Sequence, residues 1–97
     1  MIRSFRHKGL ERFFETGAKS GIRPDHARRL QLQLAVLDNA VSISDVPASW
    51  KPHQLTGSGP SGSSLDDHWA IWVSANWRLS FVFDATDVYL LDYLDYH

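Results

Sequence analysis

The chain of 97 residues contains no cysteine, so neither a disulfide nor a thiolate metal site can hold its fold. No apolar stretch reaches the length that a membrane-spanning helix needs, and the basic residues near the start are not followed by the apolar segment of a secretion signal. These absences favour a cytoplasmic protein that does not enter a membrane. With 43% hydrophobic residues and four tryptophans, residues 1–97 can build the core of one small domain.

Positive charge is scarce after residue 30. Residues 1–30 carry eight Lys and Arg against three acidic residues, a net charge of +5, whereas the remainder carries only Lys51 and Arg78 against eight aspartates, a net charge of −6. A run of charge usually marks a solvated helix face. Separation of sign between two halves also suits a surface that lies against phosphates. We therefore expect Arg28 and Arg29 to contact nucleic acid, unless they only solvate their helix or meet a protein partner.

Apolar residues at helical spacing predict a helix over residues 7–16 with Gly17 as its C-cap, and Pro24 suits the first turn of a second helix. The expected buried stripe of the second helix is Ala27, Leu30, Leu34, Leu37 and Val41. Gln33 is expected mostly outside this stripe, and His26 is expected to face solvent. The two helices are predicted to form a helical hairpin.

Alternating apolar and polar residues predict strands. The strands cover residues 1–5, 52–55, 68–73, 77–83 and 88–95. In the strand over residues 77–83, Trp77, Leu79, Phe81 and Phe83 share the face that the helices should cover, which turns Arg78 and Trp72 to the opposite face. The pattern predicts an α+β domain with a short N-terminal strand, a helical hairpin and an antiparallel sheet with the helices packed on one face.

The last residues, Asp95, Tyr96 and His97, place a carboxylate, a phenol and an imidazole in one short stretch after an apolar strand. An imidazole with a pKa of about 6.5 exchanges protons near neutral pH, and an α-carboxylate beside it favours the imidazolium. His97 is therefore a candidate general acid, with Asp95 and Tyr96 orienting a substrate or the ring itself. The alternative is the fraying without function that is usual at chain ends.

Arg78 is the only cation between Lys51 and the C-terminus. Its planar guanidinium can hold a phosphate through two parallel hydrogen bonds. The alternative is a surface salt bridge to Asp84, Asp92 or Asp95, of the kind that contributes little.

A metal site near His68 is a weaker alternative. Asp66 and His68 could converge, but consecutive strand residues point to opposite faces, so Asp67 could not easily join them. We expect no metal and no cofactor.

In several segments the chain resembles the RelE/ParE superfamily of bacterial toxins, and specifically the HigB branch. The matching segments are residues 55–57, 68–69, 73–79, 81–83 and 88–97, together with residues 1–10 and 21–27. The Asn-Trp-Arg element at residues 76–78, followed by the Asp-Tyr-His at residues 95–97, is the specific part of this resemblance.

The resemblance implies a metal-independent endoribonuclease that cleaves mRNA on the ribosome by attack of a 2′-hydroxyl on the adjacent phosphorus. It also implies a HigA-type helix-turn-helix antitoxin, through which operator DNA would be reached. The family places a phosphate-binding arginine at Arg78 and a histidine at His53, which with His97 would transfer protons or stabilise charge. Tyr96 would stack on or orient a nucleotide. Where the family carries a lysine this chain has Thr56, so either Lys51 supplies that charge or the enzyme is weaker.

Two alternatives remain open, besides an ordinary surface role for His53. The ParE branch of the superfamily poisons DNA gyrase as a binding protein, but its members lack the terminal Asp-Tyr-His pattern. A degenerate toxin that retains only antitoxin binding would fit Thr56, the acidic second half and the Gly/Ser-rich stretch over residues 56–64.

Overall fold

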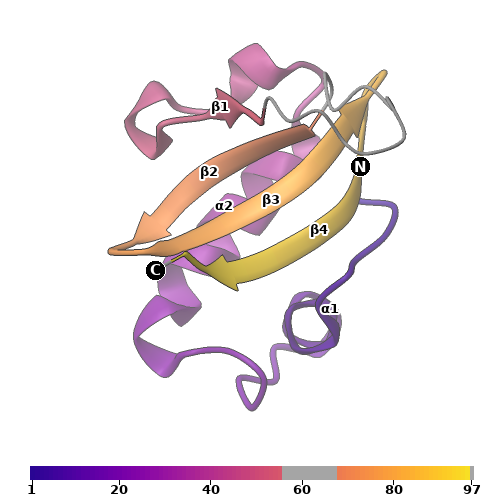
Figure 1. Ribbon diagram of the computed structural model, residues 1–97. Helices are drawn as coiled ribbons and strands as arrows, with labels where there is room; N and C mark the ends of the chain where they lie inside the picture. The colour runs from indigo at the N-terminus through magenta and orange to yellow at the C-terminus, as the bar shows by residue number, and fades with distance from the viewer. Residues whose placement is uncertain (56–67, 97) are drawn as a thin grey trace, which may run out of the picture.

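A computed structural model describes residues 1–55 and 68–96. The helices are α1 (Lys8–Thr16) and α2 (Ala27–Asn39), and the strands are β1 (His53–Gln54), β2 (His68–Ser74), β3 (Trp77–Asp84) and β4 (Asp87–Asp95). The strands form one antiparallel sheet in the order β1-β2-β3-β4. Helix α2 crosses behind the sheet, and α1, seen end-on, lies beyond β4 (Figure 1). The predicted α+β class is confirmed, whereas Thr56, Asp66, Asp67 and His97 lie outside the described residues.

Helix α1 ends where the sequence predicts. His7 caps its start, because the ring Nδ1 accepts a hydrogen bond from the backbone N–H of Leu10 at 2.9 Å. Gly17 adopts a left-handed φ of 80° and donates its N–H to the carbonyl of Phe13 at 2.8 Å. Glycine reaches this conformation without steric cost, so the predicted C-cap is confirmed.

Helix α2 differs from the predicted helix at two residues. Pro24 opens a short 3-10 turn, Pro24–His26, and the regular helix follows it from Ala27 to Asn39. Since the helix stops at Asn39, Val41 lies beyond the buried stripe and is 64% exposed. Gln33 is fully buried instead of lying outside the stripe, and its Nε2 donates to the carbonyl of Trp72 at 2.9 Å. That hydrogen bond offsets part of the cost of burying an amide.

The N-terminal segment is not the strand that the alternation predicts. It makes two isolated parallel bridges along β4, from Ile2 to Val88 and from Phe5 to Leu91. Around them, Arg3 forms an ion pair with Asp87 at 3.2 Å. The segment therefore borders β4 without extending the sheet as a regular strand.

The core lies between the sheet and the helices. Leu79 and Phe81 are fully buried on β3 and Phe83 is nearly so, as predicted, while Trp77 is half-buried at the end of the strand. The fully buried partners of these side chains include Leu10, Leu30, Leu37, Ile71, Val73, Val88 and Leu91. Each such side chain contributes about 1.5–3 kcal/mol by leaving water. One face of the sheet is thus packed against the helices.

Candidate active site on the sheet

The face of the sheet turned away from α2, which we call the site face, carries His53. Residues paired across antiparallel strands point to the same side. His53 pairs with Ala70, Ala70 with Ser80, and Ser80 with Asp92, so these four side chains form one row across the sheet. The two inner residues, Ala70 and Ser80, are small and buried, so the row has no large side chain between His53 and Asp92.

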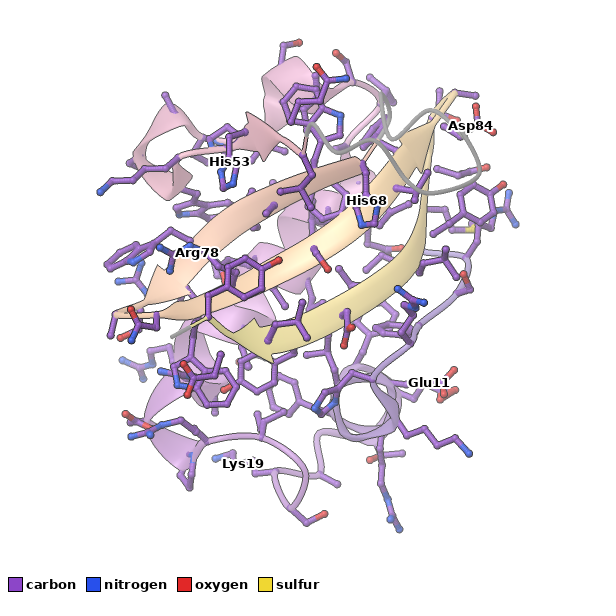
Figure 2. All side chains as sticks on the ribbon, viewed as in Figure 1. Glu11, Lys19, His53, His68, Arg78 and Asp84 are labelled. Carbon is purple, nitrogen blue, oxygen red and sulfur yellow. The ribbon has the colours of Figure 1, made fainter. Side chains whose placement is uncertain are left out.

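The next row of the site face carries Arg78. It pairs with Trp72 on one side and with Leu94 on the other. Two strand spacings of about 4.8 Å and one two-residue step of about 7 Å separate the backbone positions of Arg78 and His53. Figure 2 shows the two side chains over neighbouring parts of the sheet. The structure therefore brings these two predicted site residues to the same surface, as the alternation in β3 indicates.

Within the part of the chain that the structure describes, the guanidinium of Arg78 is held at one nitrogen. Its Nη1 donates to the carbonyls of Ala75 at 2.8 Å and Trp77 at 3.0 Å. Among the described residues, the ion pairs involve Met1, Arg3 and Arg23 but not Arg78, so the salt bridge considered for it is not formed there. Within the same residues no acceptor binds its Nε or Nη2. This second edge is the one that can hold a phosphate through two hydrogen bonds.

The ring of His53 is oriented by its own backbone neighbour. Its Nδ1 lies 3.2 Å from the carbonyl oxygen of Lys51. A carbonyl can only accept, so Nδ1 carries the hydrogen, and the neutral ring then has its lone pair on Nε2. In this tautomer Nε2 can accept a proton, and His53 is exposed.

Lys51 does not reach the site in the way the sequence suggests. The expectation that it shares the face of His53 assumes an extended segment, which is wrong because Lys51 is left-handed, with φ and ψ both 52°. Its Nζ instead lies 5.7 Å from the ring centroid of Trp72. The guanidinium carbon of Arg29 lies 5.2 Å from the same centroid. Two predicted nucleic-acid-binding residues therefore gather beside Trp72, whereas Arg28 is exposed on α2.

Asp95 and Tyr96 of the Asp-Tyr-His stretch lie on opposite faces of the sheet. Tyr96 follows Leu94 by two residues, its N–H donates to the carbonyl of Asn76 at 2.8 Å, and its side chain is 41% exposed. By alternation it points to the side of Leu94 and Arg78. Asp95 pairs with Trp77 and so lies on the opposite face. The structure thus brings Tyr96, but not Asp95, to the site face, and His97 is not described.

A buried polar pair lies behind this end of the sheet. His26 is 4% exposed, so the expectation that it faces solvent is wrong. Its Nδ1 lies 2.6 Å from the hydroxyl of Tyr93, and the ring of Tyr93 stacks on Trp77 at 4.5 Å. Burial lowers the pKa of His26 and raises the pKa of Tyr93, so both stay neutral near pH 7. The hydrogen bond between them makes this burial tolerable.

His68 lies on the site face beside Val82, and burial followed by the charge of Arg6 lowers the pKa of its ring. Within residues 1–55 and 68–96, no three His, Asp or Glu side chains gather to hold a metal ion. In the same part of the chain, neither helix is long and apolar enough to cross a membrane.

Two comparisons with known proteins agree. A family model of the RelE-like toxin of type II toxin-antitoxin system HigB matches residues 3–97. The chain is also 39% identical over 98 residues to a protein of Proteus vulgaris named Endoribonuclease HigB, an alignment that covers 100% of both chains.

Proposed function

Since the chain belongs to the family of HigB-like toxins of type II toxin-antitoxin systems, we propose that it is an endoribonuclease that cleaves mRNA on the ribosome. The name of its Proteus vulgaris relative supports the ribonuclease activity. The observation that carries the proposal is Arg78: its second guanidinium edge has no acceptor among the described residues, and it lies on the same sheet face as His53.

The cleavage that we propose is attack of a 2′-hydroxyl on the adjacent phosphorus. This reaction needs a base for the hydroxyl, positive charge for the phosphorane oxygens and an acid for the leaving 5′-oxygen. His53 is the base, because its Nε2 carries the lone pair. Arg78 holds the phosphate, and His97 is the acid. Tyr96, half-exposed beside this row, stacks on or orients a nucleotide.

Lys51 brings positive charge to the RNA backbone, where Thr56 provides none. It lies beside Trp72, which pairs with Arg78, so its ammonium is near the phosphate-binding arginine even though its backbone is not extended. Asp95 does not contact the phosphate, because its register places it on the other face. Asp95 instead orients the residues next to it in the chain.

The ribosome and a HigA-type antitoxin are the proposed partners. Few catalytic groups gather on the site face, so alignment of the message by the ribosome would supply much of the rate. Arg28 and Arg29, exposed on α2, provide cations for contact with RNA on the ribosome. Operator DNA would be reached only through the antitoxin.

A purified translation system tests the proposal. The protein should truncate mRNA in the ribosomal A site, free mRNA should be cut much more slowly, and Arg78→Ala should lose the activity. Lys19→Ala is the matched control, because Lys19 is an exposed cation outside both rows of the site face. DNA breaks that depend on gyrase would favour the ParE alternative instead. Antitoxin binding without either activity would indicate a degenerate toxin.

A further inference from the structure

Trp72 connects three cations that lie far apart in the sequence. Arg29 comes from α2 and Lys51 from the turn before β1, and both approach the indole ring, at 5.2 Å and 5.7 Å from its centroid. The third, Arg78, is linked to Trp72 through a shared acceptor. The indole Nε1 donates to the carbonyl of Ala75 at 3.1 Å, and Arg78 donates to the same oxygen at 2.8 Å.

The backbone of Trp72 is tied to the same helix as one of these cations. Gln33, one turn after Arg29 on α2, donates from Nε2 to the carbonyl of Trp72 at 2.9 Å. The side chain and the main chain of Trp72 thus both meet α2, which fixes the ring relative to Arg29. Ala75, whose carbonyl accepts both hydrogen bonds, has a left-handed φ of 48°.

The cations beside Trp72 are not neutralised by acids in residues 1–55 and 68–96. Among the described residues, neither Arg29 nor Lys51 forms an ion pair with a carboxylate. Both are exposed, while Trp72 itself is half-buried. At an exposed site, attraction to an aromatic ring raises the population of the conformer with the cation over the ring about two- to fivefold. The ring therefore restricts the side chains of Arg29 and Lys51 before an anion binds. Less conformational entropy is then lost on binding.

We propose that Trp72 is a positioning residue that holds Arg29 and Lys51 as a second phosphate-binding site beside Arg78. This inference rests on the proposed function and deepens it: Arg78 takes the scissile phosphate, and the cations at Trp72 take a neighbouring phosphate of the same RNA strand. The two cations over the ring favour a phosphate over a stacked nucleobase as the ligand. The site would bind any RNA sequence, since it contacts only the backbone.

The test uses a short single-stranded RNA made uncleavable by 2′-O-methyl groups, with its affinity measured by fluorescence anisotropy over a salt series. Lys51→Gln and Arg29→Gln should each weaken binding about two- to fivefold and reduce the slope of log affinity against log salt by about 0.7. Trp72→Leu should produce most of the same loss. Trp72→Phe, which keeps a ring face, should retain most of the affinity. Lys19→Gln should change little.

The decisive measurement is the double variant Trp72→Leu with Lys51→Gln. If the ring acts through the lysine, the double variant binds hardly more weakly than the worse single variant. Additive losses would overturn the proposal. So would a Trp72→Leu loss that leaves the salt slope unchanged and disappears with an abasic RNA, which would indicate base stacking. Absence of RNA binding by the wild-type protein at the lowest salt would also overturn it.

Cleavage in the translation system separates this inference from the proposed function. At saturating substrate, Trp72→Leu should cut at nearly the wild-type rate and raise KM, as expected for ground-state binding. If the wild-type protein cuts no message but the affinity losses of Trp72→Leu and Lys51→Gln are not additive, the phosphate site stands and the nuclease proposal fails. If the wild-type protein cuts and these losses are additive, this inference alone fails.

Discussion

Replacement of Arg78 by alanine should reduce mRNA cleavage by about 10²–10³-fold, the cost of removing one donor from a developing oxyanion. Such a loss corresponds to about 2.7–4 kcal/mol of transition-state stabilisation. The same change removes the hydrogen bonds from Nη1 to the carbonyls of Ala75 and Trp77. These bonds are partly exposed, so together they contribute about 1–2 kcal/mol to folding. A domain with a free energy of unfolding of about 5–15 kcal/mol stays folded after that loss.

Arg78→Lys separates charge from geometry. A lysine keeps the long-range attraction for RNA, but one ammonium cannot satisfy the Ala75 carbonyl and also offer two parallel donors to a phosphate. We expect its ribosome binding to remain close to wild type and its cleavage rate to fall by about 10–100-fold, between the wild-type and alanine values.

The assay is single-turnover cleavage of a defined message on programmed ribosomes, with the toxin in excess over its binding constant. Thermal unfolding of each variant is followed in parallel, so that a folding defect is seen separately. If Arg78→Ala lost binding and cleavage in equal measure, and cleaved normally once binding was saturated, Arg78 would be a docking residue and the argument from its unoccupied edge would be wrong.

Three further predictions address other parts of the molecule. Deletion of His97, or its change to Gln, should abolish mRNA cleavage while thermal unfolding and antitoxin binding stay unchanged; cleavage at full rate by the deleted protein would rule out His97 as the acid. Charge reversal at Arg28 and Arg29 together should weaken ribosome binding and flatten its dependence on salt, and an unchanged affinity and slope would leave these arginines to solvent or the antitoxin. Burial lowers the pKa of His26, so the unfolded chain takes up its proton more readily, and the free energy of unfolding should fall as the pH drops below about 6.5. Urea unfolding over a pH series should show this fall, and His26→Gln should reduce it; an equal fall in both proteins would assign the pH dependence to other groups.

Features that depend on local spacing were predictable from the sequence. The alternation of β3 places Leu79 and Phe81 in the core and Arg78 on the opposite face, because side chains of a strand alternate whatever the strand packs against. Gly17 ends α1 because the left-handed conformation of a C-cap favours glycine. The short strand that carries His53 was predicted, whereas its face was set by pairing with β2.

Features that depend on distant partners were not predictable. His26 is buried because its ring meets Tyr93, 67 residues away in the sequence. The apolar spacing of the helix does not indicate that the hydroxyl of Tyr93 will lie beside His26. Trp72 has the parity of the exposed face, but its part in the site depends on Arg29 and on the left-handed backbone of Lys51. Such contacts arise when the chain packs, and periodicity carries no record of them.

The short strand β1 gives the two halves of the candidate site unequal local stability. Arg78 lies on β3, which is paired on both sides, whereas His53 belongs to a strand of two residues that is joined only to β2. Opening β1 breaks few backbone pairs and leaves the core intact, so it requires far less free energy than global unfolding. Warming would therefore move His53 away from Arg78 while the pairing of β2, β3 and β4 persists. The molecule would pass through a folded form in which His53 and Arg78 no longer share one face of the sheet.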